Sequence, residues 1–159
     1  MRFEHLIQIN DSRLPMAALT RAQVWRGLMQ RAEDPVPFLL GLDGCRIEAR
    51  RDEGDATVLE RTLDFGAFQV EDRVRLEPES RLVQEAPATD KWPASRLTIT
   101  IEEPQADALF VRFVYESLDT TESTELDATT RALREEAYKS SDLDTVRRIR
   151  TLAEQGKLG

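Results

Sequence analysis

The chain has 159 residues, of which 40% are hydrophobic and 33% are charged, a composition typical of one folded domain. Thirty acidic residues against 22 basic ones give a formal net charge of -8, which argues against nucleic acid as a partner. No apolar run approaches the ~20 residues of a membrane span, and the start of the sequence does not resemble a signal peptide. The single cysteine cannot form an internal disulfide. We therefore expect a cytoplasmic protein.

The first part of the chain predicts a strand followed by a helix. Residues Phe3–Asn10 alternate weakly between apolar and polar side chains, as a half-buried strand does. Thr20 followed by Gln23 is a capping-box arrangement, and apolar residues then recur at helical spacing for about four turns. Pro35 and Pro37 end this helix but permit a short new one, so we expect two short helices before the next strand.

Beyond these helices the apolar period changes to two, and glycine and proline residues separate the runs. Short connections predict sequential antiparallel neighbours, because a parallel pair needs a crossover of about a dozen residues. The expected strands are Leu42–Arg50, Thr57–Phe65, Phe68–Glu77, Arg81–Ala86, Ser95–Glu103 and Ala108–Ser117.

A helical stripe of apolar residues from Leu126 to Ala153 predicts a long C-terminal helix, kinked or broken near Ser140 and Ser141. Only this helix is long enough to cover the apolar face of the expected sheet. The sequence therefore predicts an α+β protein with a single domain over 1–159, in which a curved antiparallel sheet of about seven strands wraps around the C-terminal helix. A gap between the two would form a cavity suited to a small molecule.

The hairpin around Gly66 predicts a buried ion pair. If Gly66 and Ala67 form a two-residue type II′ loop, counting outward along both strands places Arg61 opposite Asp72. Each lies in an otherwise apolar row of its strand, and Val70 belongs to the row of Asp72. The pairing is favoured because an unpaired buried charge is very costly. The pair either lines the cavity and offers its guanidinium to a ligand, or only fixes the register of the sheet.

Three other residues are candidates for contacts in the cavity. His5 shares a face with apolar residues and is either a general acid or base, or a structural histidine. Phe113 and Tyr115 belong to the uncharged row of the last strand, which we take as inward. The Tyr115 hydroxyl either orients a ligand oxygen or bonds to the backbone. Trp92, in a loop, either covers the cavity mouth or forms a dimer contact, so a homodimer is left open.

Several chemistries are excluded by the residues that the sequence lacks. One histidine and one cysteine cannot build an HExxH motif or a thiolate zinc site, and no phosphate-binding glycine loop is present, so we expect no metal and no cofactor. Asp142 and Asp144, at helical spacing from a small arginine cluster, are interpreted as surface ion-pair partners.

Five segments together resemble the AtaL-like branch of the SRPBCC (START-like) superfamily, which includes the birch-pollen-type plant allergens and has the helix-grip fold. The segments are FEHLIQIND, TRAQVWRGLMQRAEDP, LDFGAFQVEDRV, LTITIEEPQADALFVRFVYE and DLDTVRRIRTLAEQGKL, and they span nearly the whole chain.

This resemblance implies a protein that binds a small hydrophobic molecule, lipid-like or polyketide-like, between the sheet and the C-terminal helix. The alternative that it implies is a cofactor-independent polyketide cyclase or aromatase, in which Arg61, Asp72, Tyr115 or His5 would polarise a carbonyl. Binding without catalysis is favoured, because the sequence shows no set of nucleophile and base.

Overall fold

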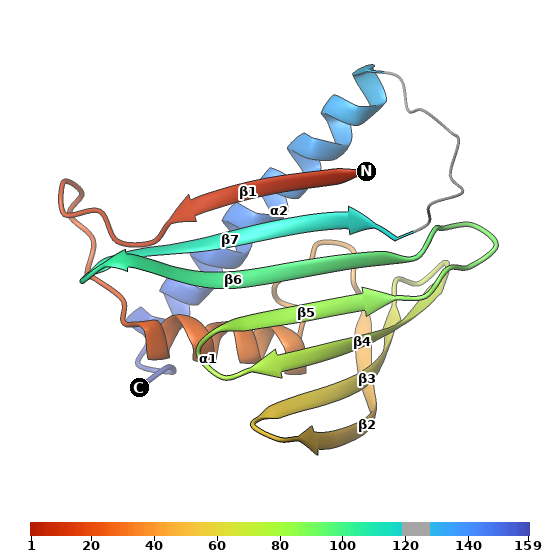
Figure 1. Cartoon of the computed structure of the whole chain (residues 1–159), viewed down its shortest axis with the longest axis horizontal. Coiled ribbons are helices and arrows are strands. Elements are labelled where there is room, and N and C mark those ends of the chain that lie inside the picture. The colour runs from red at the N-terminus through yellow and green to blue at the C-terminus, as the bar shows by residue number, and fades with distance from the viewer. Residues whose placement is uncertain (119–127) are drawn as a thin grey trace.

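The protein forms one curved antiparallel sheet with two helices against one of its faces (Figure 1). The structure is a computed structural model that describes residues 1–118 and 128–159. The order of the strands in the sheet is β1-β7-β6-β5-β4-β3-β2, so every strand after β2 pairs with its neighbour in sequence, and β1 closes on β7. The strands are β1 (Arg2–Gln8), β2 (Gly44–Glu53), β3 (Ala56–Asp64), β4 (Gln69–Glu77), β5 (Arg81–Ala86), β6 (Ser95–Gln105) and β7 (Ala108–Ser117).

Helix α1 (Arg21–Glu33) begins as the sequence predicts. The Thr20 hydroxyl accepts a hydrogen bond from the Gln23 backbone N–H, and the Gln23 side chain accepts one from the Thr20 N–H, which completes the capping box. The second short helix does not form. Residues 35–41 make turns instead, in which the N–H of Phe38 bonds to the carbonyl of Pro35 at 2.9 Å.

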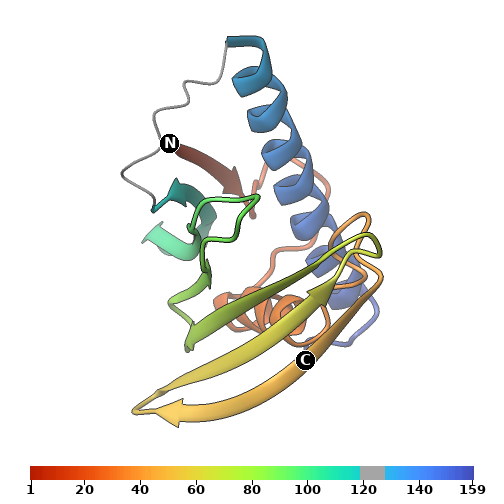
Figure 2. The same cartoon turned by 90° about the vertical axis from the view of Figure 1, so that its right-hand side faces the viewer.

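Helix α2 (Ala128–Glu154) runs without a break through Ser140 and Ser141, so the expected interruption there is wrong. Serine in a helix interior costs less than about 0.7 kcal/mol relative to alanine, which is too little to end a helix. The expected start of the stripe at Leu126 lies outside the described residues. Figure 2 shows α2 against the inner, concave side of the curved sheet.

The register of the β3–β4 hairpin confirms the counting from Gly66, because Arg61 pairs with Asp72. The N–H of Phe65 bonds to the carbonyl of Phe68 at 3.0 Å, which closes the predicted two-residue loop. Gly66 has a φ of 87°, a left-handed conformation that glycine adopts without strain.

The hydrophobic core lies between the inner face of the sheet and the two helices. Inner-face residues such as Leu97, Ile99 and Phe113 are buried, whereas their neighbours along each strand point to the outer face. The helices approach closely where Gly27 of α1 meets Ile149 of α2, since a Cβ at Gly27 would lie 2.6 Å from Ile149 Cγ1.

Candidate functional site

Arg61 and Asp72 form a buried ion pair that joins two strands to the end of α1. Arg61 donates from Nε to Asp72 Oδ1 at 2.9 Å and from Nη2 to Oδ2 at 2.6 Å. Its Nη1 donates to the carbonyl of Ala32 at 2.8 Å. The position and pairing predicted from the sequence are confirmed. Every nitrogen of this guanidinium has a partner within the protein, while its contact with a ligand stays a prediction.

A second polar cluster centres on Asp142, which projects from α2 toward the sheet and is 1% exposed. The Tyr115 hydroxyl of β7 donates to Asp142 Oδ1, and His5 Nδ1 of β1 lies 3.2 Å from Oδ2. Tyr115 also stacks on Tyr138 of α2, with ring centroids 3.9 Å apart and planes at 8°. The inward orientation expected of His5 and Tyr115 is thus observed, and the two meet through one carboxylate.

Burial shapes the proton affinity of this cluster. Desolvation raises the pKa of Asp142, and the hydrogen bonds from Tyr115 and His5 oppose the effect. Desolvation, and then the neighbouring Asp142, raise the pKa of the Tyr115 hydroxyl far above its ordinary value. Tyr115 therefore stays a hydrogen-bond donor at any physiological pH.

The interpretation of Asp142 as a surface ion-pair partner is wrong. Asp144 does pair with Arg147 at the surface, at 3.2 Å, but Asp142 lies one helical turn before Val146 and so on the face that packs inward. A carboxylate at helical spacing from Val146 and Ile149 was the signal in the sequence that could have located it.

Arg31 of α1 is a third buried polar group, and the sequence reasoning missed it. Its side chain reaches the inner face, where Nη1 lies 3.4 Å from Gln84 Oε1 of β5. The residue is 4% exposed, its Nε has no hydrogen-bond partner among the described residues, and no described carboxylate forms an ion pair with it. Desolvation lowers its pKa, and Tyr115, the next largest influence, opposes this. Arg31 follows Leu28 by three residues and so lies on the apolar stripe of α1, and this position was the signal in the sequence that could have located it.

The remaining candidates lie around these groups. Phe113 is fully buried and pairs across strands with His5, so it forms part of the apolar wall beside the Asp142 cluster. Val70 is half-buried opposite Leu63, nearer the hairpin tip. Trp92 is 55% exposed and lies against Phe68 of that tip, with ring centroids 6.4 Å apart. A role of Trp92 as a cover or a dimer contact stays a prediction.

Comparison with known proteins identifies the family. The model of the family AtaL, acetylaranotin biosynthesis cluster protein L, matches residues 7–156. The chain belongs to the AtaL family. No curated protein sequence matches it.

Solved structures give the AtaL-family chain a START-like fold. It is similar to the di-domain aromatase/cyclase StfQ of the steffimycin biosynthetic pathway (TM-score 0.66, 10% identity), where it covers 97% of its own length and 51% of that chain. It is also similar to the Zhui aromatase/cyclase of Streptomyces sp. R1128 (TM-score 0.56, 12% identity, 98% and 94% covered). A START superfamily protein of Mycobacterium smegmatis has a TM-score of 0.59 at 12% identity, with 95% and 98% covered. The chain thus spans about half the length of StfQ, and identities this low establish the fold alone.

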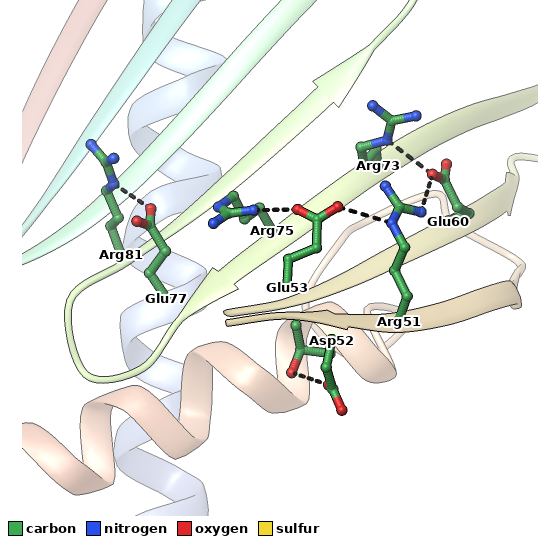
Figure 3. Close-up of polar contacts among 9 residues, drawn as sticks. Arg51, Asp52, Glu53, Glu60, Arg73, Arg75, Glu77 and Arg81 are labelled. Atoms are coloured by element: carbon green, nitrogen blue, oxygen red, sulfur yellow. Dashed lines mark hydrogen bonds and ion pairs between the residues drawn. The ribbon is translucent and has the colours of Figure 1, made fainter. Parts of the chain in front are cut away.

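The outer face of the sheet carries a groove of about 580 Å³, lined mainly by arginine and glutamate side chains. Figure 3 shows that most of these charges are paired, with Glu53 between Arg75 and Arg51, and Glu60 between Arg51 and Arg73. Hydrogen bonds from arginine lower the pKa of both glutamates. Exposed pairs of this kind contribute about 0–1 kcal/mol each. Because its charges neutralise one another, this groove is a weaker candidate than the inner face.

Neither a metal centre nor a membrane span is found in the part of the chain that the structure describes. Its His, Cys, Asp and Glu side chains form no group of three or more that could hold a metal ion. Neither of its helices is long and apolar enough to cross a membrane.

Proposed function

We propose that this AtaL-family protein binds a small, mostly apolar molecule between the inner face of the sheet and α2. The observation that carries the proposal is the Asp142 cluster, in which α2, β7 and β1 bring a carboxylate, a hydroxyl and an imidazole together beside the hydrophobic core. Burying polar groups is costly, and apolar replacements of similar volume are often at least as stable. A ligand whose oxygen atoms are oriented by these groups gives the cluster a role other than stability.

The surroundings of the cluster suit a hydrophobic ligand. Phe113, Leu97 and Ile99 are buried beside it on the same face of the sheet, and apolar walls with a few convergent polar groups are typical of small-molecule sites. The similarity to two aromatase/cyclases supports a polyketide-like compound as the ligand class.

The test begins with native mass spectrometry of the purified full chain, followed by extraction and identification of any bound small molecule. Titration with the neutral fluorescent aromatic 2-naphthol then measures binding directly. We expect Tyr115→Phe, which removes the hydroxyl on Asp142, to weaken binding about fivefold or more, as the loss of one hydrogen bond implies. Tyr138→Phe is the matched control, because it keeps the stacked ring and leaves Asp142 and Tyr115 in place. Absence of any copurified molecule together with no 2-naphthol binding would overturn the proposal.

A second candidate function, cyclase- or aromatase-like catalysis, is favoured by one specific observation. Asp142 connects the Tyr115 hydroxyl to His5, so a proton could move between an imidazole and a carboxylate at the wall of the binding region. The substrate class would be a linear poly-β-ketone, in which proton removal beside a carbonyl starts ring closure. In this case Asp142→Asn abolishes turnover of a poly-β-ketone thioester while retaining its binding. Equal turnover by the wild type and the variant would exclude this role for Asp142.

A further inference from the structure

Arg31 differs from the other buried charges because its guanidinium has no counter-ion in contact among residues 1–118 and 128–159. Arg61 is fully bound by Asp72 and the Ala32 carbonyl, and Asp142 is bound by Tyr115 and His5. Within the described part of the chain, the Arg31 side chain has only the neutral side chain of Gln84, at 3.4 Å, although it is 4% exposed. A buried guanidinium that lacks an anionic partner is strongly disfavoured.

A second buried polar group without a partner among the described residues lies on α2. Thr145 of α2 is 1% exposed, and its Oγ1 has no hydrogen-bond partner in the described part of the chain. It follows Asp142 by three residues, so the two side chains share one face of the helix. Most buried polar atoms in folded proteins have a hydrogen-bond partner, so the side chains of Arg31 and Thr145 are both open to a polar group from outside the chain.

The sheet register places the partner of Arg31 and a partner of Asp142 in one row. Gln84, which contacts Arg31, pairs across strands with Leu97, and Leu97 pairs in turn with Tyr115, which contacts Asp142. The three residues therefore form one row on the inner face, with an apolar residue in the middle. Because neighbouring strands lie about 4.8 Å apart, the backbone positions of Gln84 and Tyr115, at the two ends of this row, are separated by about 10 Å.

We infer that the ligand of this site is a carboxylic acid, whose carboxylate binds the Arg31 guanidinium and whose apolar body crosses Leu97 to bring a second oxygen to Tyr115 and Asp142. The carboxylate supplies the counter-ion that Arg31 lacks, and a guanidinium fork can donate hydrogen bonds to both of its oxygens. An apolar body of about two fused rings matches the separation of about 10 Å between the backbone positions of Gln84 and Tyr115. This inference rests on the proposed function, since it names the ligand class of that same region.

The probes that test the inference are 6-hydroxy-2-naphthoic acid and its neutral analogue 6-hydroxy-2-naphthamide, which have nearly the same shape. Calorimetric titration of the full chain should show the acid binding about tenfold tighter or more, as expected for a hydrogen bond to a charged group. The Arg31→Gln variant should lose this preference while still binding the amide. Arg26→Gln, which removes an exposed arginine of the same helix, should keep it.

The outcomes separate this inference from the proposed function. If the wild-type protein binds the amide, or 2-naphthol, as tightly as the acid, the carboxylate inference is wrong although the binding region stands. If neither the acid nor the neutral compounds bind, the proposed function itself fails. The comparison of acid with amide uses the wild-type chain, so it tests the carboxylate inference even if Arg31→Gln does not fold. A preference for the acid that persists in a folded Arg31→Gln variant would place the anion site elsewhere.

Discussion

The buried pair of Arg61 and Asp72 gives the sharpest test of how charge contributes to this fold. We consider the single substitutions Arg61→Met and Asp72→Leu and the double variant that combines them. Each single substitution leaves one buried charge without its partner, because both side chains are about 1% exposed or less. Breaking a buried pair in this way costs about 3–5 kcal/mol of unfolding free energy.

The double variant should be far less damaging than either single variant. Replacing both partners by apolar side chains of similar length leaves no unpaired charge, and such exchanges are often neutral. One loss remains, the hydrogen bond from Arg61 Nη1 to the carbonyl of Ala32 at the end of α1, which is worth about 1 kcal/mol. The expected interaction energy between the two sites is therefore at least about 3 kcal/mol, opposite in sign to the single effects.

Urea unfolding of the four proteins, followed by circular dichroism, measures this cycle. The reasoning is refuted if the single variants each lose less than about 1 kcal/mol, or if their losses simply add in the double variant. Titration of the folded double variant with 2-naphthol and with 6-hydroxy-2-naphthoic acid separates the two roles left open for the pair. Unchanged affinity means that the pair fixes the register only, and a loss of affinity means that Arg61 contacts the ligand.

Three further predictions concern stability. Gly27→Ala should lower the unfolding free energy by about 1–3 kcal/mol, because the new Cβ would lie 2.6 Å from Ile149 Cγ1. Adding Ile149→Ala to this variant should recover part of the lost stability, as measured by urea unfolding. Burial raises the pKa of Asp142 in the folded protein above its ordinary value of 3.8. Above that pH the unfolded state binds fewer protons than the folded state, so the unfolding free energy should fall as the pH rises from about 3.8. Asp142→Asn should remove this decrease, and the exposed Asp144→Asn should not, in denaturation curves recorded between acid and neutral pH. Thr20→Ala should cost about 1 kcal/mol through loss of the N-cap, and Thr20→Ser should retain most of the stability.

The sequence predicts the contacts that depend on short-range geometry. The pairing of Arg61 with Asp72 follows from counting along one hairpin, since a two-residue loop determines the register of both strands. The helix start at Thr20 likewise needs only residues within one turn. The order of β2 to β7 could be inferred because short connections favour antiparallel neighbours, whereas the pairing of β1 with β7 does not follow from any short connection.

Contacts between distant segments could not be predicted in this way. His5 and Asp142 are separated by 137 residues, and their meeting depends on how α2 is rotated against the sheet. For Asp142 the sequence supports two interpretations, a surface ion pair at helical spacing and a member of the inward stripe. The first is the commoner arrangement for a charged residue, but the packing of Ile149 against α1 turns the face that bears Asp142 inward. The inward position of Arg31 likewise depends on how α1 is rotated against the sheet, which the sequence alone does not give.

The two buried carboxylates differ in what they allow a ligand to do. Both oxygens of Asp72 accept hydrogen bonds from one guanidinium, so its charge is compensated whether or not a ligand is present. Asp142 is bound instead by a neutral hydroxyl and by an imidazole, and by no guanidinium among the described residues. A ligand that brings a negative charge to Arg31 would therefore disfavour the ionised form of Asp142, because this carboxylate responds to the added charge across the same low-dielectric layer. Binding of 6-hydroxy-2-naphthoic acid should accordingly take up a fraction of a proton, and that fraction should decrease in Asp142→Asn. Proton uptake is measured by repeating the calorimetric titration in buffers of different ionisation enthalpy, and an enthalpy independent of the buffer would show that Arg31 and Asp142 are not coupled.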